Sequence, residues 1–173
     1  DTVEQLDERI YALAGGEGSS LGTGGMVTKL RAAKIATDAG CEMVIANGSR
    51  PETLRALLNA ELLDYVAMDY KAPLDCYPAL CGADSAGVAE SLALLRNSRI
   101  PYELRTTLVP QLTEAKLRKM AAAVPADANW FLQLYRPQPG NEAHLRGLAP
   151  YTPGEIEALA ETLRRVRPNV RAR

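Results

Sequence analysis

The sequence has little of several residue types that would point to particular classes of protein. Its 173 residues include one His, three Cys, one Trp, one Phe and seven Tyr. A core with so few aromatic side chains must consist mainly of Leu, Val, Ile and Ala, which favours alternating strands and helices over an aromatic-rich β-sandwich. Three unevenly spaced cysteines are too few for a disulfide framework, and they indicate a reducing, cytoplasmic environment.

Other absences concern partners. No apolar run approaches the roughly 20 residues that span a bilayer, and no signal peptide is visible. The net charge is −1, from 20 basic and 21 acidic residues, so we expect neither a membrane nor a nucleic-acid partner. The chain begins at Asp1 rather than at Met, and we expect its true N-terminus to be missing. The basic C-terminal end is interpreted as a solvated helix face and a frayed tail.

Strand and helix patterns alternate along the chain. Apolar residues at helical spacing predict helices at 1–14, 27–39, from 51 onward, 86–97, 114–123 and from 153 onward. Short β-prone runs predict strands at 42–46, 65–70, 102–109, 130–135 and 169–172. Such alternation predicts an α/β fold with a parallel sheet and helices packed outside it, and an open sheet and part of a barrel both fit.

Several helix ends carry sequence signals. Side chains able to cap an N-terminus precede four expected helices: Ser49, Ser85, Thr113 and Thr152. Glu155 completes a capping box with Thr152, and Gly40 is the expected stop of helix 27–39. The apolar face predicted for the last helix consists of Ile156, Leu159, Leu163 and Val166.

A glycine-rich stretch, residues 15–25 (GGEGSSLGTGG), leads into helix 27–39. Missing side chains let backbone N–H groups approach an anion, and a helix N-terminus adds positive potential. Thr28 and Lys29 follow at once, and they can offer a hydroxyl and a point charge. The stretch lacks the GxxxxGK[ST] spacing of the common P-loop.

Residues 14–33 and 39–48 resemble the nucleotide-binding segment of the glutamate 5-kinases, of the amino acid kinase family. The resemblance covers residues 1–48 and implies ATP as ligand, contacted by Thr23, Gly24, Gly25, Met26, Val27, Thr28 and Lys29. The family's glutamate site, its N-terminal lysine and glycine elements and its C-terminal RNA-binding-type domain are absent. We therefore expect descent from a kinase without kinase activity in this chain.

From Asn47 onward the resemblance changes. Five stretches are similar to the radical SAM activating proteins of anaerobic ribonucleoside-triphosphate reductase: 47–54 (NGSRPETL), 63–73 (LDYVAMDYKAP), 101–110 (PYELRTTLVP), 133–137 (QLYRP) and 168–170 (PNV). This implies that residues 49–173 are the C-terminal part of a partial (β/α) barrel of radical SAM type, which forms one compact domain with residues 1–48. It also implies S-adenosylmethionine (SAM) contacts by Lys71, Asp69, Arg105 and Asn47, and a glycyl-radical ribonucleotide reductase as partner.

That family binds a [4Fe-4S] cluster through a CxxxCxxC loop, which this sequence lacks. Cys76 and Cys81 have the wrong spacing and are interpreted as incidental free thiols. The family's DTNG string at the preceding strand end appears here as IANG, residues 45–48, so its Asp and Thr are lost. His144 is interpreted as a surface loop residue, and no metal ligand or catalytic residue is predicted.

Three functional hypotheses therefore stand. The chain is an activase fragment that is inactive alone, an ATP-binding fragment of a glutamate 5-kinase (an enzyme of proline biosynthesis), or a composite with no function of its own. The two resemblances meet at Asn47–Gly48. A natural gene fusion, a recombination and an error of sequence assembly would all produce such a join.

Overall fold

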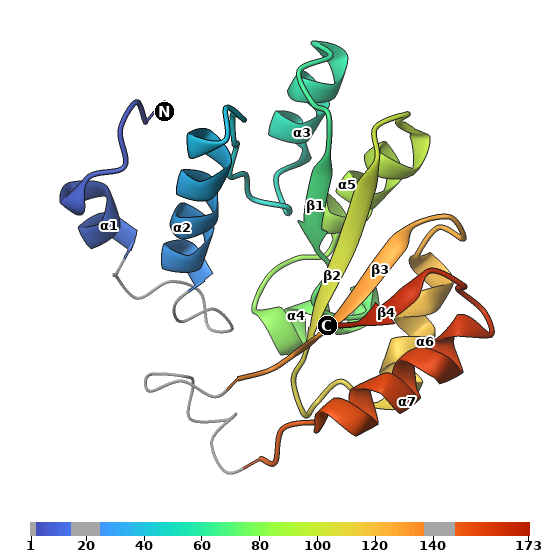
Figure 1. Ribbon diagram of the computed structural model, residues 1–173. Coiled ribbons are helices and arrows are strands. Elements are labelled where there is room, and N and C mark those ends of the chain that lie inside the picture. Colours follow the sequence, from blue (N-terminus) through green and yellow to red (C-terminus); the bar gives the residue numbers. More distant parts are fainter. Residues whose placement is uncertain (1–2, 15–24, 137–147) are drawn as a thin grey trace. The chain divides into compact units, whose positions relative to one another are not determined.

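The structure is a computed structural model that describes residues 3–14, 25–136 and 148–173 (Figure 1). Its internal contacts divide the chain into two units. The first comprises residues 1–45 and 138–146, and the second comprises residues 46–137 and 147–173. The predicted union of the two resembling pieces in one compact domain stays a prediction.

The first unit contains two helices, α1 (Glu8–Ala14) and α2 (Gly25–Asp38). Before α1, Asp7 Oδ1 accepts the Ile10 N–H at 3.0 Å. Helix α2 confirms the helix predicted at 27–39 and ends as predicted at Gly40, whose φ is +80°. The Gly40 N–H donates to the Thr37 carbonyl and the Cys41 N–H to the Ala36 carbonyl, which is a Schellman motif with glycine in its favoured place.

The strand predicted at 42–46 is wrong. Residues 41–47 have no regular secondary structure. A buried strand would enclose its apolar side chains, yet Met43, Val44 and Ile45 are all exposed. High β-propensity gives a strand only where a neighbouring strand accepts its backbone hydrogen bonds, and the structure records no such pairing for this run.

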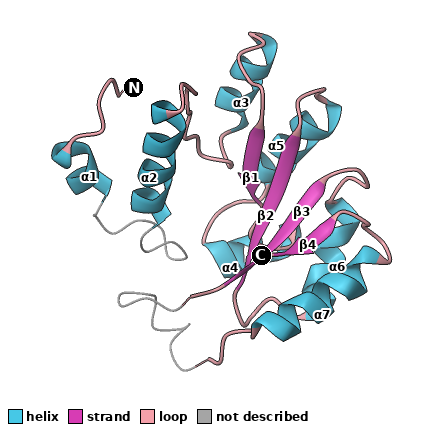
Figure 2. Cartoon of the chain, in the orientation of Figure 1, coloured by secondary structure: helices cyan, strands magenta, loops and turns pink. Residues whose placement is uncertain are grey.

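The second unit carries the remaining elements (Figure 2). In chain order these are α3 (Pro51–Asn59), β1 (Val66–Asp69), the 3₁₀ turn η1 (Leu74–Cys76), α4 (Tyr77–Cys81), α5 (Ala86–Asn97), β2 (Tyr102–Leu108), α6 (Glu114–Ala123), β3 (Asn129–Leu134), α7 (Pro153–Arg164) and β4 (Val170–Ala172). The strands predicted near 65–70, 102–109, 130–135 and 169–172 are confirmed, as are the helices at 86–97 and 114–123.

The four strands form one parallel sheet in the order β1-β2-β3-β4. Helices α5, α6 and α7 connect successive strands. Each of these three connections is a right-handed crossover between parallel strands. Each also leads to the next strand in the same direction across the sheet, so all three helices cover the same face. The α/β class with parallel strands is thereby confirmed.

The core lies between this face and the helices. Leu104, Leu108, Trp130 and Leu132 alternate along β2 and β3 and are fully buried with apolar residues of α5, α6 and α7. One polar chain crosses the core. The Trp130 indole N–H donates to Thr106 Oγ1 at 2.9 Å, and Thr106 Oγ1 donates to the Tyr70 carbonyl at 2.6 Å, so the buried polar atoms of Trp130 and Thr106 both have partners.

Most helices begin where the sequence predicts, but fewer of the predicted capping hydrogen bonds are made. The Thr152–Glu155 capping box is confirmed. Thr113 and Ser85 occupy N-cap positions, but their side chains make no capping hydrogen bond. The predicted Ser49 cap of α3 is wrong because the N-cap is Arg50. The Ser49 hydroxyl donates instead to Asn47 Oδ1 at 2.8 Å.

The C-terminal end is ordered by hydrogen bonds, so the expectation of a frayed tail is wrong. Arg164 Nε donates to the Val170 carbonyl at 2.9 Å, and Arg167 Nε donates to the Val124 carbonyl at 2.6 Å. Val166, predicted on the apolar face of α7, lies past the end of that helix and is exposed.

Helix α5 also holds the turn that precedes α3. The Ser91 hydroxyl donates to the Gly48 carbonyl at 2.9 Å. One helical turn earlier, a Cβ atom on Gly87 would lie 1.9 Å from the Ser49 carbonyl oxygen, so this close approach requires glycine. Within the described ranges, no helix is both long and apolar enough to cross a membrane.

Candidate functional site

The residues predicted to contact ATP lie at the start of α2. Gly25 is its first residue, and Met26, Val27, Thr28 and Lys29 form the rest of its first turn and the start of the second. The first N–H groups of a helix have no intrahelical acceptor, and an anion can accept hydrogen bonds from such groups. Thr28 and Lys29 are exposed. Thr23 and Gly24 lie outside the described residues.

Two of the predicted SAM contacts are neighbours at the carboxyl end of β1. Asp69 pairs in register with Arg105 of β2. Both side chains lie on the face opposite Leu104, which is the face that the helices do not cover. Lys71 follows two residues after Asp69, and its backbone N–H donates to Tyr77 Oη at 3.0 Å.

Asn47 has a different role from the one predicted by resemblance. Its side-chain oxygen accepts two hydrogen bonds from Ser49, one from the backbone N–H at 3.0 Å and one from the hydroxyl at 2.8 Å. This pattern closes the turn before α3. The structure therefore gives Asn47 a local structural contact, and its predicted part in SAM binding is not tested.

Tyrosine and cysteine side chains with raised pKa values lie along the segment that follows β1. Burial raises the pKa of Tyr77 to about 12, and burial also raises the pKa of Tyr70. Burial raises the pKa of the Cys81 thiol, while the nearby charge of Lys71 opposes that shift. These groups stay neutral near pH 7, so they support packing and hydrogen bonding rather than proton transfer.

Cys41, Cys76 and Cys81 are free thiols. Over residues 3–14, 25–136 and 148–173, no three His, Cys, Asp or Glu side chains gather closely enough to hold a metal ion. His144 lies outside these ranges.

A charged cluster on the uncovered face of the sheet was not predicted. Glu103 Oε2 accepts from the Tyr65 hydroxyl at 2.8 Å, and Arg105 Nε donates to Glu103 Oε1. Arg173 Nη1 lies 3.8 Å from the same oxygen, and the Arg173 guanidinium stands 4.3 Å from the centroid of the Phe131 ring. Alternation in residues 102–108 could have placed Glu103 beside Arg105, but no local signal reveals Arg173, which is far away in sequence.

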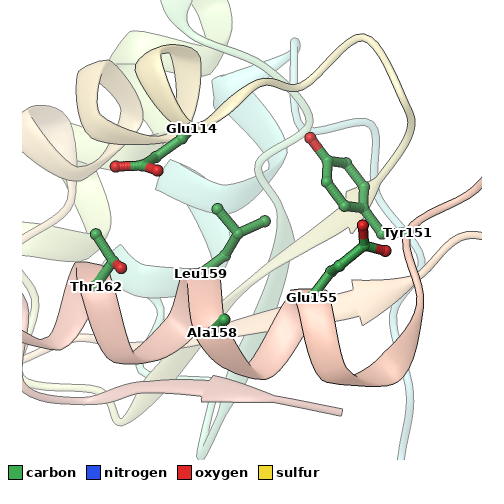
Figure 3. Close-up of a pocket in the computed structure, with 6 residues that line it drawn as sticks. All are labelled: Glu114, Tyr151, Glu155, Ala158, Leu159 and Thr162. Atoms are coloured by element: carbon green, nitrogen blue, oxygen red, sulfur yellow. The ribbon is translucent and has the colours of Figure 1, made fainter.

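A shallow groove between α6 and α7 is lined by Glu114, Tyr151, Glu155, Ala158, Leu159 and Thr162 (Figure 3). Both of its carboxylates are already engaged. Arg118 Nε donates to Glu114 at 2.9 Å, and Glu155 serves the capping box with Thr152, which lowers the Glu155 pKa. The groove is therefore a shallow surface depression, and its two carboxylates do not form a catalytic acid–base pair.

No family model matches the chain. It is similar over part of its length to curated glutamate 5-kinases: 59% identical over 61 residues to that of Clostridium acetobutylicum (35% of this chain, 23% of the relative) and 54% over 59 residues to that of Clostridium perfringens (34% and 22%). Identity to the Shewanella amazonensis enzyme is 44% over 73 residues (42% and 19%). The chain thus spans about a fifth of the length of these relatives.

These comparisons establish similarity to glutamate 5-kinase for a segment of the chain. A matched stretch of 61 residues cannot end before residue 61, so the similarity runs past residues 1–48. The resemblance of residues 49–173 to the radical SAM activating proteins stays a prediction.

Proposed function

We propose that the kinase-like stretch binds the phosphate groups of ATP at the N-terminal end of α2, without phosphorylating glutamate in this chain. The observation that carries the proposal is the 59% identity to a glutamate 5-kinase over 61 residues. Gly25, the last residue of the glycine-rich stretch, is the first residue of α2, and this position supports the proposal.

The chemistry of this end of α2 suits a phosphate. Backbone N–H groups from Gly25 onward would donate to phosphate oxygens, the exposed Lys29 would add a positive charge, and the Thr28 hydroxyl would add a donor. The chain spans about a fifth of its relatives, so most contacts of a complete enzyme would be missing. We therefore expect a dissociation constant of roughly 100 μM or weaker, because few contacts offset the cost of immobilising the nucleotide.

The test is a calorimetric titration of Mg-ATP into the full chain and two lysine variants. Lys29→Ala should weaken binding by about tenfold, which is roughly what loss of one charge-assisted phosphate contact costs. Lys34→Ala is the matched control, because Lys34 lies on the same helix and pairs with Asp38 at 3.0 Å. Binding that survives Lys29→Ala unchanged would show that this end of α2 is not the site.

A second candidate concerns residues 49–173, which we propose to be the C-terminal part of a radical SAM barrel. Two observations favour it: the strands follow one another in chain order with their helices on one face, and Asp69 lies beside Arg105 on the other face. With Lys71 at the strand end, these residues would hold SAM. A glycyl-radical reductase as partner belongs to this proposal.

The residues present do not fit the cluster of that family. Cys76 and Cys81 supply two thiols where three are needed, and the Cys81 thiol is partly buried with a raised pKa. We therefore propose SAM binding without cleavage. Anaerobic iron–sulfur reconstitution should yield no 5′-deoxyadenosine above a protein-free control, and Lys71→Ala should weaken SAM binding. Unchanged SAM affinity in Lys71→Ala would remove this candidate.

A further inference from the structure

We propose that the face of the sheet not covered by helices binds a small oxyanion, a carboxylate or a phosphate, between the guanidinium groups of Arg105 and Arg173. This site would be separate from the ATP candidate, and it would share Arg105 with the SAM candidate. It lies wholly within the second unit, and it does not depend on ATP or SAM binding.

The site would be organised by one buried carboxylate. The Glu103 side chain is only 7% exposed although it lies on the uncovered face of the sheet. Its two oxygens have different partners: Tyr65 donates to Oε2 at 2.8 Å, while Arg105 and Arg173 both face Oε1. Because two cations converge on one oxygen, their guanidinium groups must be close neighbours.

Both guanidinium groups are held in place yet reachable from solvent. The side chains of Arg105 and Arg173 are 36% and 55% exposed. Arg105 is fixed by its strand and by Glu103, and Arg173 is fixed by the Phe131 ring, 4.3 Å from its guanidinium carbon. A guanidinium carries five N–H donors, so contact with a single carboxylate oxygen leaves donors for a second acceptor. Two pre-positioned forks suit a bidentate oxyanion.

The charge of this face also favours an anion. Strand alternation and register place five charged side chains on it: Asp69, Glu103, Arg105, Arg171 and Arg173. Three of these are positive and two are negative, and the two guanidinium groups of the proposed site face a single carboxylate, that of Glu103. A ligand that bridges both forks would replace water without uncovering Glu103.

The carboxylate that organises the cluster lies apart from Lys71, although the cluster shares Arg105 with the predicted SAM contacts. Tyr65 immediately precedes β1, and Glu103 is the second residue of β2, so both lie toward the amino ends of these strands. Arg105 pairs with Asp69, the last residue of β1. Lys71 lies past the carboxyl end of β1.

Arginine side-chain NMR on the full chain tests the proposal directly. Sodium phosphate and sodium acetate are titrated separately, with sodium chloride used to keep the ionic strength constant. We expect the Nε–Hε signals of Arg105 and Arg173 to shift and saturate in the low millimolar range. Saturation by both anions, or by one alone, would support the site and show whether it binds phosphate, carboxylate or both. Saturation by neither would overturn it.

Three variants test whether anion binding depends on these two arginines. Arg173→Lys keeps the positive charge but removes the planar fork, and it should weaken binding at least fivefold. Arg105→Lys should do the same. Arg165→Lys is the control, since Arg165 is exposed at the end of α7, and its replacement should change nothing. Equal effects of all three variants, in proteins whose thermal unfolding is unchanged, would reduce the interaction to general charge attraction and refute the site.

Discussion

The two units of this chain differ most in how many of their apolar residues are buried. In residues 3–13 and 26–45, only Leu30 and Ala33 are buried. The second unit instead has a continuous core that joins the sheet to α5, α6 and α7. Large apolar side chains left exposed in the first unit are Val3, Leu13, Met26, Ile35, Met43, Val44 and Ile45.

This difference has a physical explanation in the comparisons. The kinase-like stretch corresponds to about a fifth of a longer relative. Helix propensity and turn signals are local, so α2 and its Gly40 stop persist in such a stretch. Burial requires partners that are distant in sequence, so it does not persist when those partners are absent. Helix α2 shows that a segment can keep its secondary structure without keeping a core.

The largest effect should appear in hydrogen exchange. Amide protons of β2 and β3 should exchange about a thousandfold or more slowly than those in the middle of α2, because the sheet opens only with its core while α2 opens locally. Exchange followed by NMR at pH 6 measures both in one sample. Equal protection in α2 and β3 would break the comparison, since it would show that both units unfold together.

Truncation of one leucine in each unit provides the next test. Leu132→Ala in β3 should lower the free energy of unfolding by about 3 kcal/mol, because its side chain is fully buried and would leave a cavity. Leu30→Ala in α2 should cost less than about 1 kcal/mol in the same transition. Urea unfolding monitored by Trp130 fluorescence measures the sheet unit. A loss above about 2 kcal/mol for Leu30→Ala would contradict the expected independence.

Alkaline pH should destabilise the second unit selectively. The Tyr77 pKa is raised from 10.0 to about 12 by burial, so the folded state keeps a proton that the unfolded chain releases. The associated stability is complete below pH 10 and is lost as pH rises toward 12. Two pKa units correspond to about 2–3 kcal/mol. Unfolding measured from pH 8 to 11.5 should show a shallower decline in Tyr77→Phe, and an unchanged decline would refute the assignment.

The smallest effect compares two helix ends. Helix α3 ends as α2 does, with the Glu61 N–H donating to Leu58 and the Leu62 N–H to Leu57, but the residue at positive φ (54°) is Glu61 instead of glycine. Glu61→Gly should stabilise the second unit by about 0.5–1 kcal/mol, because glycine adopts this conformation without a steric penalty.

The matched change in the first unit is Gly40→Ala. It should lower the helicity of α2 in circular dichroism and leave the unfolding midpoint of the sheet unchanged, because no described residue of α2 belongs to the buried core of the sheet. A shift of that midpoint by more than about 1 °C would show that α2 does contribute to the stability of the sheet.

Much of the second unit could be predicted from sequence because its signals are local and mutually consistent. The alternation in residues 102–109 gave β2, and Thr152 with Glu155 gave the start of α7. The strand at 42–46 failed because propensity alone cannot supply a pairing neighbour. Ser49 failed as a cap because its hydroxyl donates to Asn47 Oδ1 and the N-cap position falls on Arg50.

The candidate sites could be predicted less fully. Asp69 and Arg105 were both predicted by resemblance to contact SAM, and their register places them side by side. The cluster around Glu103 was missed because Arg173 reaches it through strand pairing at the far end of the chain. A contact of that range depends on topology, and no window of the sequence contains it.

The fit between Gly87 and the Ser49 carbonyl has a consequence for the sequence changes that this chain can tolerate. Ser49 lies in the turn before α3, whereas Gly87 lies in the first turn of α5, on the other side of β1 in the sequence. The two residues are therefore far apart in sequence, yet the backbone path at Ser49 requires residue 87 to lack a side chain. Any substitution at position 87 would push the Ser49 carbonyl away and displace the start of α3. If the first sixty residues were exchanged for another sequence, the recipient would accept only a turn whose backbone follows this same path.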